Sequence, residues 1–371
     1  DSLRQNTTGS NNSALGKDSL RQNTTGGSNT AIGKDSLLLN TTGSFNTAIG
    51  LQALKANTTA DGNTACGDRT LFDNTTGANN SAFGRVALEN NTNGDRNVAL
   101  GGLALRKNTT ASNNTAVGYE SLKENLTGQS NTAVGAFSLD SNLSSNNTSI
   151  GFNSLTANTT GGNNTAVGTN ALEANTTGIN NVSVGMQCLK DNTTGSSNVA
   201  SGVNALLKNT SGGNNTGIGT SALQENTTAS NNTALGAVAL RYNTTGTQNT
   251  ALGANAGDVI TEGDNNTSLG YQADPSSATA NNEVTLGNSS VATLRCNVQT
   301  ISSLSDARDK TNVIDLPEGL DFVTKLRPVK FEWATRDGNG KDGSFEHGFI
   351  AQDLQTAQKE NDADYLNMVM D

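Results

Sequence analysis

Residues 152–168 read FNSLTANTTGGNNTAVG, and blocks of this pattern fill the chain from its first residue to about residue 287. One glycine closes every block, and successive closing glycines are seventeen residues apart except for the sixteen between Gly135 and Gly151. A period this strict is typical of repeat proteins whose units stack on their neighbours and share a continuous core. The sequence therefore predicts one long array. The closing glycines are Gly16, Gly33, Gly50, Gly67, Gly84, Gly101, Gly118, Gly135, Gly151, Gly168, Gly185, Gly202, Gly219, Gly236, Gly253, Gly270 and Gly287.

Each block contains two short apolar segments, represented by Ser154–Leu155 and Thr165–Val167, which Asn, Thr and Gly residues separate. A helix needs about ten residues of 3.6-residue periodicity, and no such stretch fits between these turn signals. The repeat is therefore expected to be β-structure. In a strand, side chains alternate between the two faces. We expect large side chains of the Leu155 and Val167 type to point inward, and those of the Ala166 type and the threonines to point outward.

The Gly and Asn positions match the corners of a regular coil, because both residues tolerate a positive φ. Asn pairs such as Asn163 and Asn164 recur at the same phase, so stacking would align their amides into ladders along the axis. Proline is absent before Pro275. This absence fits a stack in which the backbone N–H groups are needed for hydrogen bonds.

The composition indicates self-association. Of the 371 residues, 33% are hydrophobic and 4% are aromatic, so one chain has little to bury. A parallel homotrimer would bring three thin apolar stripes together on a threefold axis. The predicted fold is an all-β repeat fibre, a β-roll or triple-β-helix-like solenoid, with a small α+β domain after it. Two coil paths stay open: three parallel solenoids of roughly 80 Å, or intertwined chains up to about three times longer.

Several classes of function are disfavoured by charge and motif content. A net charge of −10 without a basic run argues against nucleic acid and anionic membranes as partners. No apolar stretch reaches the roughly 20 residues that a membrane span needs. The cysteines at 66, 188 and 296 lack metal-ligand spacing, and the array lacks clusters of His, Cys or paired carboxylates. We therefore expect no cofactor, no metal site and no enzyme within the array. Because Asp1 opens inside a repeat, the chain is expected to be a piece of a longer protein.

The composition changes after the array. The predicted domains are 1–287 for the fibre shaft, 288–301 for a transition segment, and 302–371 for a second domain rich in charged residues and aromatics. In the second domain the sequence predicts a short helix over 318–326, a strand over 329–333 and a helix up to about Glu360. The glycine-rich residues 337–343 predict a turn rather than a calcium loop, because Lys341 stands where a ligand would be needed.

Three motifs in the second domain resemble a known family. They are SDARDKTNV from Ser305, LRPVKFEW from Leu326 and HGFIAQD from His347. Together they resemble the C-terminal intramolecular chaperone domain of phage tailspikes, tail fibres and endosialidases, which is also a self-cleaving Ser/Lys peptidase. This resemblance implies Ser305 as nucleophile and Lys310 as base, with His347 either assisting them or forming a structural hydrogen bond. Asp309 replaces a residue that is usually apolar, and the long C-terminal helix of the family is missing, so the domain is expected to be incomplete.

The array has a resemblance of its own. Its Asn-Thr-Ala-Ile-Gly motif, as in Asn29 to Gly33, is similar to the Asn-Ser-Val-Ala-Ile-Gly repeats in the heads of trimeric autotransporter adhesins. Those heads are trimeric β-rolls with a period shorter than seventeen residues. The resemblance therefore implies a trimeric β-structure without fixing the path of the coil.

These observations lead to two hypotheses. The first is a trimeric phage or viral tail fibre that binds a host cell-surface glycan or receptor, with a chaperone that cleaves itself off beside Ser305 in a single turnover. The alternative is a secreted or cell-surface fibre or adhesin of a cellular organism, with N-linked glycans on sequons such as those of Asn6, Asn40 and Asn158. Turn chemistry alone also explains these sequons, and is the favoured explanation. A protease acting on other substrates is disfavoured, because one self-directed dyad beside a long array does not suggest turnover.

Overall fold

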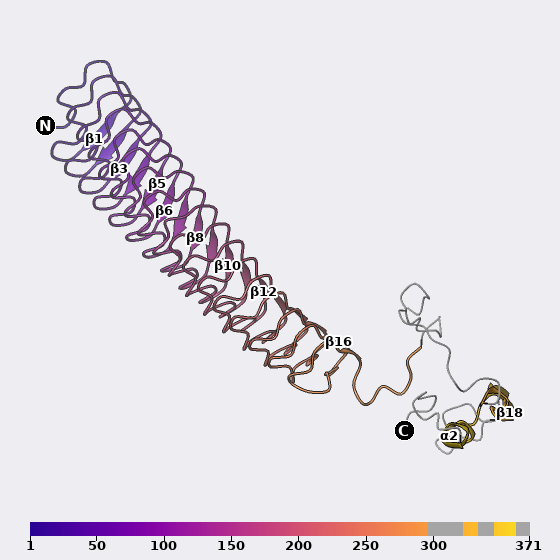
Figure 1. The fold of residues 1–371 in the computed structure, drawn as a ribbon. Helices are drawn as coiled ribbons and strands as arrows, with labels where there is room; N and C mark the ends of the chain where they lie inside the picture. The colour runs from indigo at the N-terminus through magenta and orange to yellow at the C-terminus, as the bar shows by residue number, and fades with distance from the viewer. Residues whose placement is uncertain (296–321, 333–344, 361–371) are drawn as a thin grey trace, which may run out of the picture. The chain divides into compact units, whose positions relative to one another are not determined.

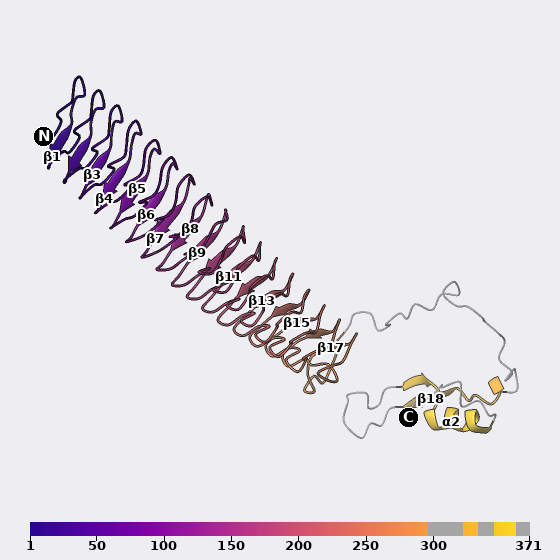
Figure 2. The same ribbon diagram turned by 60° about the vertical axis from the view of Figure 1, so that its left-hand side comes forward.

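The structure is a computed structural model that describes residues 1–295, 322–332 and 345–360. The chain divides into two compact units, Asp1–Thr293 and Leu294–Asp371. The first unit is a parallel β-solenoid in which each repeat forms one coil and contributes one three-residue strand to a continuous sheet (Figures 1 and 2). The predicted all-β solenoid with a seventeen-residue repeat is therefore confirmed.

The sheet of the solenoid contains strands β1 to β17, all parallel. Every strand pairs with the next one along the chain at equivalent positions, as Ala166 of β10 pairs with Ser183 of β11. Successive repeats of one chain therefore lie side by side, and the chain does not follow the intertwined path. The strands are Ser13–Leu15, Thr30–Ile32, Thr47–Ile49, Thr64–Cys66, Ser81–Phe83, Val98–Leu100, Thr115–Val117, Thr132–Val134, Thr148–Ile150, Thr165–Val167, Val182–Val184, Val199–Ser201, Thr216–Ile218, Thr233–Leu235, Thr250–Leu252, Thr267–Leu269 and Val284–Leu286.

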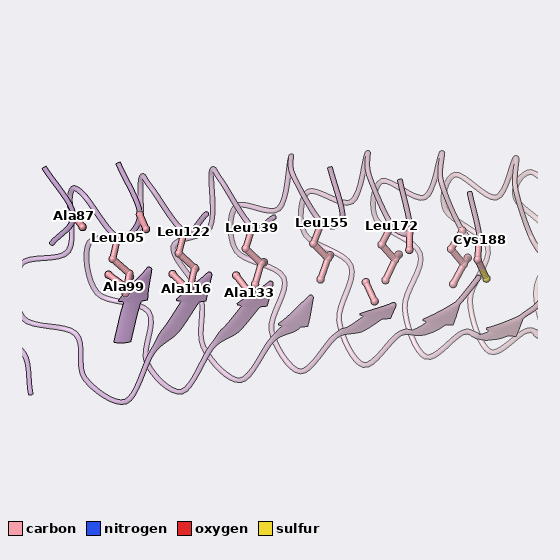
Figure 3. Close-up of a cluster of buried hydrophobic side chains, with 14 of the residues drawn as sticks. Ala87, Ala99, Leu105, Ala116, Leu122, Ala133, Leu139, Leu155, Leu172 and Cys188 are labelled. Atoms are coloured by element: carbon pink, nitrogen blue, oxygen red, sulfur yellow. The ribbon is translucent and has the colours of Figure 1, made fainter. Parts of the chain in front are cut away.

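The core of the solenoid is a column of leucines. Leu155 and its equivalents from Leu20 to Leu240 are fully buried, as predicted. Figure 3 shows Leu105, Leu122, Leu139 and Leu155 stacked from coil to coil, each beside the strands. A single chain thus builds a continuous apolar core from one leucine in nearly every coil and the small residues around it.

Within the strands, the threonines point outward as predicted, but the orientations predicted for residues of the Ala166 and Val167 type were wrong. The middle residue, such as Ala166, is fully buried, whereas Val167 and its equivalents lie on the outer face. The reason is the thinness of the coil. At Gly217, the middle residue of β13, an added Cβ would lie 3.4 Å from Cδ1 and Cγ of Leu206. The leucine already fills the space under the strand, so only Ala, Ser or Gly fits there, and the large aliphatic residue must face outward.

The segment that carries the leucine is not a strand either. Asn170 and Leu172 both have left-handed backbone angles, with φ of 56° and 51°. This alternation aims the N–H of Asn170 at Phe152 O in the previous coil, 2.9 Å away, and the N–H of Leu172 at Cys188 O in the next coil, 3.1 Å away. A left-handed leucine costs about 1–2 kcal/mol. Burying the leucine side chain stabilises the fold by about 1.5–3 kcal/mol, which offsets the cost of the left-handed backbone.

Two columns of buried asparagines support the corners. In one column, Asn175 Nδ2 donates to Asn158 Oδ1 of the previous coil at 2.8 Å. In the other, Asn164 Nδ2 donates to the backbone oxygen of Gly178 in the next coil at 2.9 Å. The predicted amide ladders are therefore present, and Asn164 is the buried member of its pair whereas Asn163 is exposed at φ 60°.

The ladder of the Asn175 column ends near the C-terminal end of the array. In the coil after Asn243, glycine replaces the core leucine at Gly257, and isoleucine replaces the ladder asparagine at Ile260. Ile260 is 1% exposed, and its Cδ1 lies 3.4 Å from where a Cβ of Gly257 would be. The isoleucine therefore takes over the volume of the missing leucine, and Asn243 Oδ1 is left buried without a hydrogen-bond partner.

The second unit contains a hairpin and a helix. Strand β18, Val329–Glu332, pairs antiparallel with β19, Phe345–Gly348, and helix α2 spans Ala351–Glu360. The predicted strand and second helix are confirmed within the described ranges. The first predicted helix, over 318–326, ends earlier than expected: the backbone is helical at 322–323 and forms a turn at 324–325, while 318–321 lie outside the described residues. The predicted turn at 337–343 lies outside the described residues.

Candidate functional site

The predicted self-cleavage site lies mostly outside the described residues. Ser305 and Lys310 both fall in the range 296–321, so the structure does not place the dyad. His347 is described: it is exposed on β19, opposite Lys330 of β18 in the antiparallel register.

Lys330 was not singled out from the sequence. Its ammonium lies 4.8 Å from the ring centroid of Phe345, on the neighbouring strand, in a cation–π contact. The hairpin therefore presents a histidine and a lysine at paired positions. The alternation of VKFE within the predicted strand, which separates Lys330 from the partly buried Val329 and Phe331, was the signal that could have found this lysine.

Helix α2 is held to the segment before β18 by charge and by apolar packing. Arg327 Nη2 lies 3.1 Å from Asp353 Oδ2 in the first turn of the helix. Phe322 and Ala357 are each 6% exposed, and Leu326 packs against them. The hairpin that carries His347 is therefore followed by a helix with its own small apolar core.

The three sequon asparagines belong to the amide ladder. Asn40 is fully buried, and its Nδ2 donates to Asn23 Oδ1 at 2.8 Å and to Gly43 O at 2.9 Å. Asn158 is equally buried, and Asn6, in the first coil, is partly buried. An N-linked glycan attaches to this same nitrogen, so a glycan on Asn40 or Asn158 would displace ladder hydrogen bonds. These asparagine side chains therefore stabilise the turn of their own coil and the stacking of successive coils.

The outer face of the sheet runs along the whole array. We define it as the first and third residues of strands β1 to β17. The first residues are Ser, Thr or Val throughout, and the third residues are Leu, Ile, Val or Phe except for Cys66 and Ser201. No charged residue occurs at any of these positions. The third-position row is Leu15, Ile32, Ile49, Cys66, Phe83, Leu100, Val117, Val134, Ile150, Val167, Val184, Ser201, Ile218, Leu235, Leu252, Leu269 and Leu286.

Many charged residues lie instead on the two positions that follow the core leucine. Glu89 is 3% exposed and accepts from Arg69 Nη2 at 2.7 Å and from Arg106 Nε at 2.9 Å. Similar ion pairs link successive coils, for example Lys208 with Glu225. Asp140 occupies the same corner, where burial raises the pKa of its carboxyl group. The charges of this corner are thus largely paired within one chain.

An aromatic cluster lies just after the closing glycines of three successive coils. The rings of Tyr119 and Phe137 have centroids 5.7 Å apart, and those of Phe137 and Phe152 are 5.9 Å apart, both in edge-to-face geometry. Tyr119 and Phe152 are each about half exposed. In a chain with few aromatics, this cluster offers a local apolar patch with one hydroxyl group.

The comparison with protein families concerns the second unit. Residues 305–362 match the Peptidase S74 family model, described as chaperone of endosialidase. The chain carries a chaperone-of-endosialidase domain in its C-terminal part. The match begins at Ser305 and includes Lys310 and His347. No curated protein and no solved structure matches the chain significantly.

In residues 1–295, 322–332 and 345–360, no group of three or more His, Cys, Asp or Glu residues is placed to hold a metal ion. In the same ranges, no helix is long and apolar enough to cross a membrane.

Proposed function

We propose that this chain is the shaft of a trimeric phage or viral tail fibre that attaches to a host cell surface, and that its chaperone-of-endosialidase domain assembles the trimer. The order of the parts carries this proposal: a stiff, regular solenoid is followed by a domain of a family whose name denotes assistance to another protein. A solenoid of 17-residue coils fixes distance rather than forming a deep pocket. Mechanical extension and surface recognition are its natural functions.

The aromatic cluster supports the recognition part of the proposal. Tyr119, Phe137 and Phe152 expose planar apolar surface beside the Tyr119 hydroxyl group, which suits a host glycan with apolar ring faces and hydroxyl groups. Binding of the fibre to host cells should fall when Tyr119 and Phe152 are both replaced by Ala. Replacing the exposed threonines Thr177 and Thr228 instead should leave binding unchanged.

The release step is proposed to be self-cleavage at the bond between Leu304 and Ser305. The Ser305 hydroxyl oxygen would attack the Leu304 carbonyl carbon through a five-membered ring, while neutral Lys310 accepts the hydroxyl proton. The peptide C–N bond would break as the amine of Ser305 takes up a proton, leaving an ester that water hydrolyses. Desolvation in the folded trimer would lower the pKa of Lys310 and make it a competent base. Cutting would then follow assembly.

Intact mass and denaturing gels test this step. Wild-type chain should yield fragments 1–304 and 305–371, whereas Ser305→Ala and Lys310→Ala should stay uncut. Ser303→Ala is the matched control and should be cut like wild type. His347→Ala should slow cutting if the imidazole assists the base. Processing of Ser305→Ala at the wild-type rate would remove the dyad from the proposal, and a wild-type chain that assembles but stays whole would remove self-cleavage from this chain.

A further inference from the structure

We propose that copies of this chain meet through the outer face of the sheet, in parallel and in register, about an axis along the solenoid. This inference rests on the trimer proposed above and names the surface that would hold it together. The sequence leads us to expect apolar stripes of both the Leu155 type and the Val167 type to meet in a trimer. The leucines are buried within each chain, so only the Val167-type row is available for that contact.

The third-position row of the outer face is apolar over almost the whole length of the array. It includes Ile32, 39% exposed, Leu235, 44% exposed, and Leu15, 70% exposed. At about 4.8 Å per coil the row extends for roughly 80 Å. Monomeric soluble proteins rarely expose a contiguous apolar patch of more than a few hundred Å². An apolar residue recurs at the third strand position of almost every repeat, so the exposed row is a property of the whole array rather than of one coil.

A second copy of the chain fits this face better than an unrelated protein. A partner must present apolar groups at the same spacing over the same length, with no charge to leave unpaired. The outer face of another copy has that spacing, length and composition. The other corners do not compete for this role, because Glu89 and the neighbouring ion pairs satisfy their charges within one chain. Closed symmetry of identical copies is also the rule among soluble oligomers.

In a parallel, in-register assembly, the same residue of every copy lies at the same level along the axis. Cys66 of β4 would meet Cys66 of the other copies, between the layers of Ile49 and Phe83 with which it pairs along the sheet. In an aligned antiparallel assembly, β4 would instead face β14, about 48 Å from the other Cys66. Cys66 is therefore a natural reporter of register, since it lies on the outer face whereas Cys188 is fully buried.

The first experiment measures molar mass by light scattering, on the full chain, with circular dichroism as a check of folding. Val184→Lys with Leu235→Lys places charges on the outer face, at positions already exposed in a single chain, so the solenoid should persist. The mass should fall from three chains to one with an unchanged spectrum. Thr177→Lys with Thr228→Lys adds equal charge to the same two coils at another exposed corner, and should stay trimeric.

The second experiment uses Cys66 as the sole cysteine, after Cys188→Ala and Cys296→Ser. Oxidation by Cu(II)-phenanthroline should join two chains, as two thiols lose two protons and two electrons to copper. A non-reducing gel should show covalent dimers for about two thirds of the chains, because a trimer holds three thiols. A chain whose only cysteine comes from Thr228→Cys should not cross-link.

The outcomes separate this inference from the proposed function. A wild-type chain that is folded and single would overturn both the trimer and the interface. If the wild type is a trimer and Val184→Lys with Leu235→Lys is still a trimer, the proposed trimer stands but the outer face is not its interface. A trimer that dissociates with those charges but gives no Cys66 cross-link would overturn the parallel register.

Discussion

Replacing Asn175 by Ala should open the solenoid locally, because this amide is fully buried in the ladder. Its Nδ2 donates to Asn158 Oδ1 at 2.8 Å and to Gly178 O at 3.1 Å, and its Oδ1 accepts from Asn192 Nδ2 at 2.8 Å. Gly178 O keeps a second donor, the side chain of Asn164. Asn158 Oδ1 keeps no donor in the ladder.

The magnitude follows from these contacts. An orphaned buried acceptor costs about 1–3 kcal/mol, and each lost hydrogen bond about 0.5–1.5 kcal/mol, so Asn175→Ala should cost about 4 kcal/mol. That corresponds to about a 10³-fold rise in the population of locally opened coils. Because each coil contacts only its neighbours, the effect should stay within a few coils of the substitution.

Native-state hydrogen exchange, read by mass spectrometry, is the suitable assay. Peptides from about residue 158 to 195 should lose protection, whereas peptides before residue 100 should exchange as in wild type. Asn180→Gly is the matched control, since Asn180 is an exposed asparagine of the same coil at φ 58°, where Gly is tolerated. Equal protection in Asn175→Ala and Asn180→Gly would refute the argument that the buried ladder stabilises the array.

Three further predictions concern other features of the array. Gly168→Ala should destabilise its coil by several kcal/mol, because an added Cβ at φ 136° would lie 2.4 Å from Gly185 O. Gly162→Ala should be mild, because its Cβ would meet only Ser145 O, at 3.2 Å, and urea unfolding compares the two variants. Asp140→Asn should stabilise the protein near pH 7 but not at a pH below the ordinary carboxyl pKa. Burial raises the pKa of Asp140 in the folded protein, so the wild type loses stability as the pH rises from the ordinary carboxyl pKa through the raised one. Unfolding measured at both pH values checks this. Intact mass should show the 38.0 kDa chain, or its cleavage fragments, without hexose additions at Asn40, and a glycan there would contradict its ladder role.

The sequence predicts the parts of the fold that depend on one residue type. The period, the corner glycines, the inward leucines and the Asn ladders follow from the chemistry of Gly, Leu and Asn. The direction of Val167 does not, because the rule that large apolar residues face inward fails when Leu155 already fills a thin coil. The left-handed leucines also leave little signal, since only their neighbours, such as Asn153 and Asn170, are residues that favour this conformation. For the proposed self-cleavage site, the family resemblance implies Ser305, Lys310 and His347, and of these only His347 falls within the described residues.

Gly257 in place of the core leucine and Ile260 in place of the ladder asparagine affect how the stack could grow. Parallel strands in register with amide ladders are also the architecture of amyloid, in which an open end templates the addition of further chains. Beyond Asn243 this column holds Ile260 in place of the next amide, although the coils of β16 and β17 still stack in register after it. The C-terminal end of the array therefore presents no asparagine of this column to a further coil, which makes that end a poorer template for open-ended growth than the interior of the stack.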